Sequence, residues 1–162
     1  MFEVIEKVDV ESIEKLPYLS MFIKELLRMY PPIASIPAKI TSKDVQLGDY
    51  FLPKGTLVSV SVLDIHMNED LYENPKEFKP ERWDRNAKKK IPHYAWIPFS
   101  SGSRICIGNN FSLMEQKIFF TEFLMNYEVS LTDTNDEVTV SSTSGIIQSP
   151  NKVQVKFTKV KK

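Results

Sequence analysis

The chain contains one cysteine, Cys106, in a segment whose residue types could support chemistry. The segment reads IPFSSGSRICIGNNF, residues 97–111, and places the thiol between Gly102 and Gly108 and two residues after Arg104. The glycines allow a sharp turn and a close approach of the backbone to another group. The helix predicted to follow points its positive end back toward the sulfur, which favours the thiolate over the thiol. Arg104 adds a fixed cation suited to pairing with a carboxylate.

The residues alone leave three interpretations of Cys106 open. A lone cysteine is most often a small buried side chain without reactivity. A cysteine nucleophile requires a base, and His66 and His93 are the two histidines in the sequence. A single thiolate can also bind haem iron, since the porphyrin supplies four further donors. Neither histidine lies in a known catalytic signature, so we expect both to form structural hydrogen bonds.

The composition is that of an ordinary globular domain. The 162 residues are 42% hydrophobic and 26% charged, which is enough for one core. Lys+Arg and Asp+Glu both number 21, so the charge balance indicates neither a nucleic-acid partner nor an acidic substrate. One cysteine excludes an intramolecular disulfide, and one cysteine with two histidines is too few for a Cys/His zinc site. No stretch approaches 18 uninterrupted apolar residues, and the first residues lack the order of a secretory signal.

Hydrophobic periodicity predicts the elements that must position these residues. Apolar residues at helical spacing predict a helix over 18–29. Alternating residues and turn signals, such as Gly48-Asp49, predict short strands within 33–63, followed by a short helix or turn near 69–72. Prolines then interrupt residues 74–102, but the aromatic content of this stretch predicts an ordered, packed loop rather than a solvated linker.

A second long helix is predicted over 109–126. Its buried face is expected to carry the apolar residues Ile107, Phe111, Leu113, Met114, Ile118, Phe120, Leu124 and Met125. From residue 137 onward the chain is strand-like, with Val138 and Val140 leading into a turn and alternation resuming over 153–157. The order of helix, strands, aromatic loop, helix and strands predicts an α+β fold.

Three motifs carry a resemblance to a known family. FSSGSRICIG, residues 99–108, fits F-x-x-G-x-R-x-C-x-G at every specified position, and so resembles the haem-binding loop of the cytochrome P450 family. IKELLR contains Glu25 and Arg28 as the family's E-x-x-R pair, and FKPERW contains Arg82 of its P-E-R-F/W segment. The resemblance covers nearly the whole chain. It implies that residues 1–162 are the C-terminal fragment of a single, mainly helical cytochrome P450 domain.

The resemblance also implies roles for the residues of the loop. Cys106 would be the axial thiolate ligand of the iron of haem b. Backbone N–H groups around Ile107 and Gly108 would donate to the sulfur, at the turn that begins with Gly102. Arg104 would pair with a haem propionate. Phe99 would pack beside the sulfur and the macrocycle, unless it belongs to the ordinary core.

For the E-x-x-R pair the pattern and the resemblance lead to different expectations. Helical projection puts Glu25 and Arg28 off the main apolar stripe, as in a weak solvated ion pair. The resemblance instead implies that Glu25, Arg28 and Arg82 form a buried network that holds the aromatic loop under the haem. That role is structural, and within this fragment the only catalytic group implied is the haem ligand itself.

Two departures from the family pattern are visible. The position ten residues after Arg28, where the family usually has a propionate-binding arginine, is Ala38, followed by Lys39. Lysine lacks the bidentate fork of arginine, so a replacement by Lys39 would be imperfect. The family's oxygen-activating helix, membrane anchor and most of its substrate pocket lie upstream of the E-x-x-R motif, and only 24 residues precede Glu25.

The function implied is that of a haem-thiolate monooxygenase, represented by its proximal haem-binding half. Such an enzyme inserts one oxygen atom from O₂ into a small lipophilic substrate, with electrons from an NADPH-dependent reductase or a ferredoxin. Its full-length parent is expected at the cytoplasmic face of the endoplasmic reticulum membrane. The alternatives are a non-catalytic truncated or degenerate fragment and a haem-thiolate isomerase or dehydratase. Residues 140–147 are a candidate turn lining the substrate pocket, or an ordinary hairpin.

Overall fold

The structure is a computed structural model that describes residues 8–87, 89–132, 140–143, 147–150 and 153–160. It begins with two helices, α1 (Val10–Glu14) and α2 (Pro17–Met29). The α2 helix lies where periodicity predicts it, with Pro17 in its first turn, where a missing N–H is tolerated. The α1 helix was not predicted. It is marked in the sequence only by a capping box, in which Asp9 accepts from Ser12 N–H and the Ser12 side chain accepts from Asp9 N–H.

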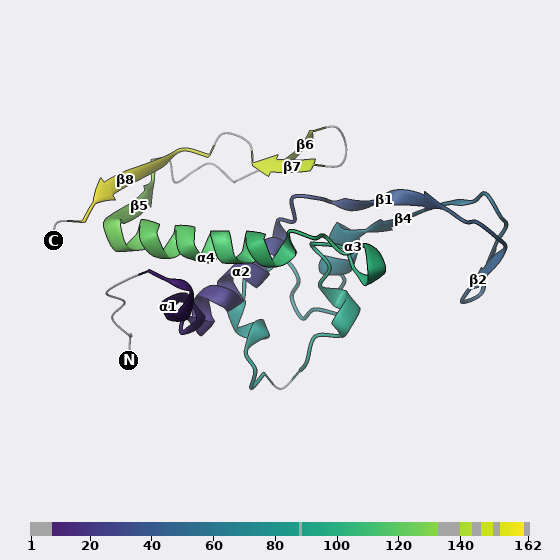
Figure 1. Ribbon diagram of the computed structural model, residues 1–162, viewed down its shortest axis with the longest axis horizontal. Helices are drawn as coiled ribbons and strands as arrows, with labels where there is room; N and C mark the ends of the chain where they lie inside the picture. Colours follow the sequence, from purple (N-terminus) through teal and green to yellow (C-terminus); the bar gives the residue numbers. More distant parts are fainter. Residues whose placement is uncertain (1–7, 88, 133–139, 144–146, 151–152, 161–162) are drawn as a thin grey trace.

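Two antiparallel strand pairs form a long arm that projects away from the helices (Figure 1). Strands β1 (Ser35–Ile40) and β4 (Leu57–Ser61) pair along its base, and β2 (Val45–Leu47) pairs with β3 (Tyr50–Leu52) at its tip. The tip turn contains Gly48 at φ +55°, a left-handed conformation that glycine adopts without strain. These strands confirm the predicted run of short strands.

The end of that run differs from the prediction, because a short helix, α3 (Val62–His66), begins directly after Ser61. The side chain of Ser61 accepts a hydrogen bond from Asp64 N–H at 3.2 Å and so caps the helix. Val62, expected as a strand residue, is instead the first helical residue and is buried. The stretch 69–72 is a turn, one of the two outcomes predicted for it.

Residues 74–102 form the irregular, ordered segment that their aromatic content predicts. Within and just after it lie three 3₁₀ helices, η1 (Pro80–Trp83), η2 (His93–Ala95) and η3 (Gly102–Arg104). The rings of Trp83 and Trp96 meet edge to face with centroids 5.8 Å apart, in an arrangement that aromatic pairs favour. This contact brings η1 next to the residue that follows η2.

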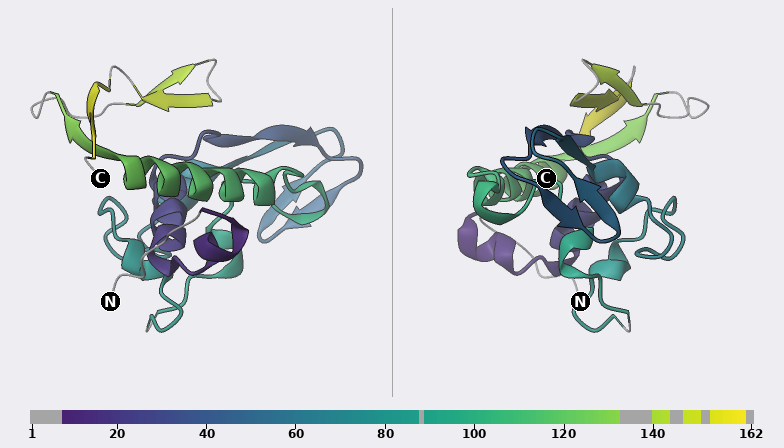
Figure 2. Two further views of the ribbon diagram at one scale, coloured as in Figure 1. Left: turned by 60° about the vertical axis from the view of Figure 1, so that its left-hand side comes forward. Right: turned by 90° about the vertical axis from the view of Figure 1, so that its right-hand side faces the viewer.

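The second long helix, α4 (Asn109–Asn126), has the predicted bounds. Strand β5 (Tyr127–Leu131) follows it and pairs with β8 (Val155–Lys159), while β6 (Val140–Thr143) pairs with β7 (Ile147–Pro150). The β5–β8 pair lies at the C-terminal end of α4, opposite the end that faces the β1–β4 arm (Figures 1 and 2). The predicted strand start at Val138 and the tip of the predicted 140–147 turn, residues 144–146, lie outside the described residues.

The core is small and lies between α1, α2, α3 and the aromatic loop. Its buried apolar residues are Ile13, Ile23, Leu27, Val62, Tyr72, Ala95 and Ile97. No helix within the described residues is long and apolar enough to cross a membrane.

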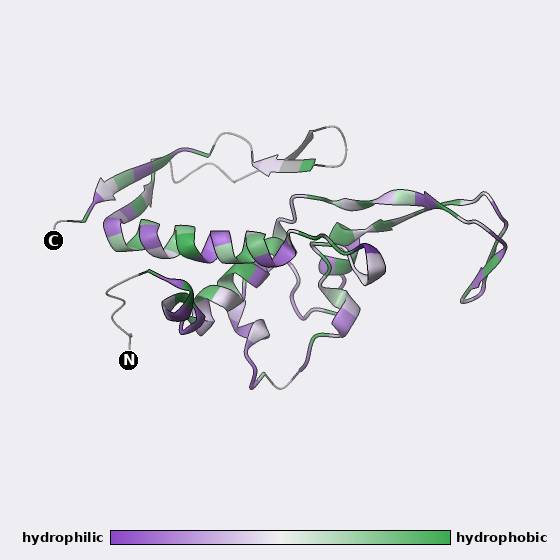
Figure 3. Ribbon diagram, viewed as in Figure 1, coloured by the Kyte–Doolittle hydropathy of each residue, from purple (hydrophilic) through white to green (hydrophobic). Residues whose placement is uncertain are grey.

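The prediction of a buried apolar face on α4 is only partly met, because Leu113, Met114, Phe120 and Met125 are half-buried and no residue of the predicted face is fully buried. Of the helix residues only Thr121 is buried, whereas Phe111 is 72% exposed and Leu124 60% exposed. The predicted face also included Ile107, which is fully exposed, and Ile118, which is exposed. Hydrophobic residues recur along α4, as its colouring shows (Figure 3), and the helix packs against α1 and α2 and, near its C-terminal end, against β5. Phe123 also meets Phe157 of β8, with ring centroids 5.1 Å apart.

Candidate functional site

The carboxylate of Glu25 lies at the centre of a buried polar network. Glu25 and Arg28 both come from α2 and both have fully buried side chains. Arg28 donates from Nε to Oε2 of Glu25 at 2.9 Å and from Nη2 to Oε1 at 2.8 Å. Such a two-pronged contact is the strongest pairing of guanidinium and carboxylate. The expectation of a solvated pair, drawn from the helical projection, is therefore wrong.

Three further donors reach the same carboxylate from the aromatic loop. Arg82 donates from Nε to Oε1 at 2.9 Å, Lys79 N–H donates to Oε1 at 3.0 Å, and Trp83 Nε1–H donates to Oε2 at 2.9 Å. Burial raises the pKa of Glu25, but hydrogen bonds from Arg28, Lys79, Arg82 and Trp83 outweigh it and hold the pKa below its ordinary value. Glu25 is therefore a stabilised anion and not a proton donor at neutral pH.

The two guanidinium groups use their remaining donors on backbone carbonyls. Arg28 donates to the carbonyls of His66 at 2.8 Å and Glu77 at 3.2 Å. Arg82 donates to the carbonyls of Glu73 at 3.1 Å and Glu77 at 3.2 Å. The network thus ties α2 to α3, to η1 and to the residues just before η1, and it leaves no buried side-chain donor or acceptor unpaired among the described residues.

His66, the last residue of α3, is, like Lys79 and Trp83, a member of this cluster that sequence reasoning did not assign to the network. Its side chain is fully buried. The backbone N–H of Ile97 donates to Nε2 at 3.0 Å, so Nε2 is the acceptor and Nδ1 carries the proton, which it donates to the carbonyl of Arg28 at 3.1 Å. Burial and the Arg28 charge lower the pKa of His66 to about 4. The neutral ring therefore serves as a two-sided hydrogen-bonding bridge.

The cysteine loop follows directly from Ile97 and has a different character. Cys106 is exposed, and its backbone N–H donates to the carbonyl of Phe99 at 3.0 Å, which closes the loop on itself. Gly102 at φ +75° and Ser100 at φ 65° both adopt left-handed conformations, so the turn is tight. A Cβ built on Gly108 would lie 3.9 Å from Sγ of Cys106, which places the sulfur close to the backbone at the start of α4.

The other predicted loop residues lie in the same loop as this thiol and are exposed or half-buried. Arg104, on η3, is exposed, and Phe99 is half-buried with its ring 6.5 Å from that of Trp96. The two residues that flank Cys106, Ile105 and Ile107, are both exposed isoleucines. Gly108 is the N-cap of α4 and offers no side chain to the first-turn N–H groups. The structure thus brings the loop residues together, separately from the Glu25 network.

Comparison with known proteins places this chain in a family. The family model described as Cytochrome P450 matches residues 2–157. The chain is 34% identical to Cytochrome P450 3A12 of Canis lupus familiaris over 146 residues, which are 90% of this chain and 29% of that protein. It is 31% identical to Probable cytochrome P450 4p3 of Drosophila melanogaster over 154 residues, 95% of this chain and 30% of that protein. The chain belongs to the cytochrome P450 family.

Solved structures show the same fold over a similar share of their length. The chain matches the structure titled "Retinoic acid bound cyanobacterial CYP120A1" with a TM-score of 0.85 and 27% identity, covering 98% of this chain and 36% of that one. It matches the cytochrome P450 CYP102L1 with a TM-score of 0.84 and 27% identity, covering 95% of this chain and 34% of that one. The predicted fold, α+β and part of the P450 fold, is confirmed. The chain spans less than a third of the length of the curated relatives.

The residues of the cysteine loop fit the haem that the P450 family implies. A thiol flanked by exposed isoleucines offers one soft ligand and an apolar border, as a flat macrocycle requires. Among the described residues no three His, Cys, Asp or Glu side chains gather as a metal site, so a metal at Cys106 would need to bring its other donors with it. A porphyrin does so. Cys106 is therefore the residue of this loop that could hold a haem iron.

The position of the family's usual propionate-binding arginine and the second histidine of the sequence both lie outside the cysteine loop. Ala38 and Lys39 lie exposed on β1, where the pairing with β4 is irregular between Ile36 and Lys39. An exposed Lys39 is free to approach an anionic group from this strand, whereas Ala38 has no polar side chain. His93 lies exposed on η2, with its ring 4.7 Å from that of Tyr94, and takes no part in the Glu25 network.

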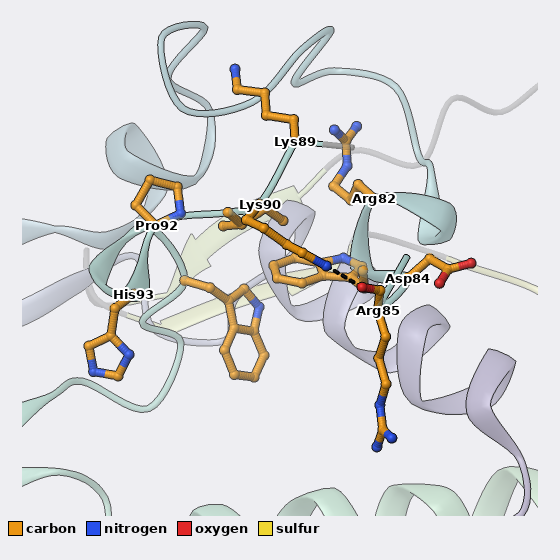
Figure 4. A pocket seen from close by; sticks show the side chains of 10 residues that line it. Arg82, Asp84, Arg85, Lys89, Lys90, Pro92 and His93 are labelled. Carbon is orange, nitrogen blue, oxygen red and sulfur yellow. Dashed lines mark hydrogen bonds between the residues drawn. The ribbon is translucent and has the colours of Figure 1, made fainter. Parts of the chain in front are cut away.

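A separate hollow of about 310 Å³ lies on the aromatic loop (Figure 4). Basic side chains line much of it, among them Arg82, Arg85, Lys89 and Lys90, and Lys90 donates to the carbonyl of Arg85. None of its lining residues belongs to the stretch 97–108. This basic hollow is therefore distinct from the cysteine site.

Proposed function

We propose that this chain contributes the thiolate face of the haem site of a cytochrome P450 monooxygenase, with Cys106 as the axial ligand of haem b. The observation that carries the proposal is the exposed thiol at the start of α4, in a loop that matches the family pattern F-x-x-G-x-R-x-C-x-G. When bound, the haem supplies the binding and reduction of O₂ and the insertion of one oxygen atom into a lipophilic substrate.

Each loop residue has a part in holding the cofactor. The backbone N–H groups of Ile107 and Gly108 are proposed to temper the charge on the sulfur once the iron is bound. Arg104 pairs with a propionate. Phe99 shields the ligand from water and braces the loop against Trp96. Gly102 supplies the left-handed turn that lets the loop fold back on Phe99.

The Glu25 network acts as the support beneath this loop. Glu25, Arg28 and Arg82 make no contact with Cys106 itself, but they fix α2 against the aromatic loop from which the cysteine loop continues. Removing one member would leave a charge buried without its partner, which makes the arrangement sensitive to substitution. We assign these three residues a structural and not a catalytic role.

We also propose that residues 1–162 are the C-terminal portion of a single P450 domain, covered by the rest of that domain. The α4 helix supports this proposal, because its large apolar side chains Phe111 and Leu124 are 72% and 60% exposed. Exposed apolar side chains gathered on one element are typical of a surface that another part of the protein covers.

The parent protein is proposed to draw its electrons from an NADPH-dependent reductase or a ferredoxin and to lie at the cytoplasmic face of the endoplasmic reticulum, held by an N-terminal anchor. The 34% identity to a 3A-type relative supports a monooxygenase of small lipophilic substrates. The open α4 face favours a second candidate, in which the chain by itself is a non-catalytic fragment. A haem-thiolate isomerase or dehydratase on the same scaffold is a third.

The ligand assignment is tested by spectroscopy of the haem-loaded chain. Reduced protein exposed to CO should show the strongly red-shifted Soret band of thiolate ligation. Cys106→Ser should abolish that band, while Ser103→Ala, an exposed change in the same loop, should preserve it. An unchanged spectrum in the Cys106 variant would refute the ligand role.

Catalytic competence is tested separately, with haem, a reductase and NADPH. The chain alone should not hydroxylate a lipophilic substrate, whereas co-expression with the remaining two-thirds of a P450 domain should restore O₂-dependent product. Hydroxylation by the chain alone would contradict the fragment proposal. Product formed without O₂ or reductase would favour the isomerase or dehydratase.

A further inference from the structure

Three consecutive residues at the start of the cysteine loop are each held by a different element. Tyr72 OH donates to the carbonyl of Ala95 at 2.8 Å, and Trp96 Nε1–H donates to the carbonyl of Lys24 on α2 at 3.1 Å. The third tie is the Ile97 N–H, which donates to Nε2 of His66 on α3 at 3.0 Å. The hydrogen bond to His66 is the last of the three before the loop turns outward toward Cys106.

His66 is joined to the Glu25 network through reciprocal hydrogen bonds with Arg28. Nδ1–H of His66 donates to the carbonyl of Arg28 at 3.1 Å, and Nη1 of Arg28 donates to the carbonyl of His66 at 2.8 Å. Both residues are fully buried, so neither bond competes with water. Because Arg28 also donates two hydrogen bonds to Glu25, a shift of the His66 imidazole would disturb the whole network.

We propose that His66 is a positioning residue for Cys106: its imidazole transmits the fixed geometry of the Glu25–Arg28 pair to the backbone of Ile97. From Ile97 the chain continues through buried Pro98 to Phe99, whose carbonyl accepts from Cys106 N–H at 3.0 Å. A continuous path of short contacts therefore runs from Glu25 to the backbone of the cysteine. The effect of this path on a haem ligand rests on the proposed function. The path of hydrogen bonds from Glu25 to the Cys106 backbone exists whether or not haem binds.

Two variants separate this role from general stability. His66→Gln places a carbonyl oxygen near the position of Nε2 and can accept from Ile97 N–H, but it loses the donor to Arg28. His66→Asn places an amide near the position of Nδ1 and can donate to the Arg28 carbonyl, but it loses the acceptor for Ile97. Each variant removes one ring hydrogen bond, so their global stabilities should be similar, and only the link to the loop should differ.

Amide hydrogen exchange of the chain without haem provides the test. In His66→Asn the N–H groups of Ile97 and Cys106 should exchange about tenfold faster than in the wild type, the equivalent of one lost hydrogen bond. In His66→Gln the exchange rates of the Ile97 and Cys106 amides should stay within about threefold of their wild-type values. In each variant these rates are compared with those of α2 amides, which report global unfolding. Equal acceleration in both variants, or no change at Cys106 in either, would overturn the proposal.

The wild type gives a test that does not depend on the variants folding. If His66 controls the loop, Ile97 and Cys106 amides should open together, with the same protection factor within about threefold. Rapid exchange at Cys106 beside a protected Ile97 would also overturn the proposal.

The haem-loaded variants then connect the link to ligation. His66→Gln should keep a larger share of the red-shifted CO band than His66→Asn. If the exchange pattern holds but the wild type gives no such band, the haem proposal fails and the mechanical link stands. If the band forms equally in both variants while exchange differs, His66 positions the loop without influencing ligation, and the inference fails for Cys106 as a ligand.

Discussion

Glu25 and Cys106 are the two side chains of most evident chemical character in this chain, and their surroundings are opposite. Glu25 is fully buried and accepts five hydrogen bonds, all from residues of this chain. Cys106 is exposed, and its sulfur lies beside the backbone of Gly108 and between two exposed isoleucines. One site is complete within the chain, and the other is open.

This difference separates the residues that stabilise the fold from those proposed to bind the cofactor. A buried carboxylate persists only where its charge is matched and its oxygens are hydrogen-bonded, so the Glu25 network must be assembled whenever the chain is folded. An exposed thiol imposes no such requirement and leaves the loop free to accept a large apolar group. The network therefore governs stability, whereas the role proposed for the cysteine loop is cofactor binding. Substitutions at the two sites should separate these two properties.

The largest loss of stability is expected from Glu25→Gln. The amide keeps the shape of the side chain but removes the negative charge, so Arg28 remains buried without its counter-ion, and the free energy of unfolding should fall by about 3–5 kcal/mol. Urea denaturation followed by circular dichroism measures the change. The matched control is Glu11→Gln, which removes an exposed pair with Lys15 at 3.8 Å and should change stability by less than about 0.5 kcal/mol. Similar losses in both variants would show that burial of the Glu25 pair has no energetic consequence.

The second effect in size is the acid sensitivity that His66 confers. Above pH 6.5 the imidazole is neutral in both the folded and the unfolded chain, so it contributes no pH dependence. Between pH 6.5 and about 4 the unfolded chain takes up a proton that the folded chain does not, and the free energy of unfolding falls as the pH falls. A pKa lowered from 6.5 to about 4 corresponds to a loss of about 3 kcal/mol over this window.

Denaturation curves measured at about pH 7, about pH 5.5 and about pH 4.5 test this dependence. His66→Gln should remove this part of the slope and leave the fall due to Glu25, whose lowered pKa makes its contribution disappear at still lower pH. His93→Gln, at an exposed position, is the matched control and should retain the slope. A wild type equally stable across the window would refute a neutral, buried His66.

The sequence predicts the long elements of this fold better than its buried polar contacts. The bounds of α4 and the turn at Gly48 follow from local periodicity and turn residues, and both are observed. Burial of Glu25 does not follow from local pattern, because its partners Lys79 and Trp83 lie 54 and 58 residues further along the chain. The family motif, which combines distant segments, pointed to this cluster where helical projection did not.

The errors have the same physical origin. Periodicity predicts an apolar surface on α4 but not whether anything covers it, and Phe111 and Leu124 remain exposed here. The lone histidine in VLDIHM gave a weak sign of its role, since a polar residue among apolar ones in a short helix needs buried partners. Those partners, Arg28 and Ile97, come from both directions in the sequence. Only the assembled fold identifies them.

A moderate loss of stability is expected from Arg82→Lys, which preserves the positive charge but replaces the planar guanidinium and its several N–H donors with a single ammonium group. Arg82 donates to Glu25 and to the carbonyls of Glu73 and Glu77, and a lysine on one site cannot reach all three, so stability should fall by about 2 kcal/mol. Arg85→Lys, at an exposed position of the same loop, should change it by less than about 0.5 kcal/mol. Thermal or urea unfolding compares the two. Equal effects would mean that the second arginine of the network acts only through its charge.

Cys106→Ser is expected to change stability least of all these substitutions, although it should have the largest effect on haem ligation. Because the thiol is exposed and supports no packing, the chain without haem should keep its free energy of unfolding within about 0.5 kcal/mol. Ile23→Ala, in the buried face of α2, should lower it by about 2–5 kcal/mol and serves as the reference for a structural residue. The serine variant should nevertheless lose the red-shifted CO band that the wild type gives with haem. A large destabilisation in Cys106→Ser would mean that the cysteine belongs to the scaffold, and the division between the two sites would fail.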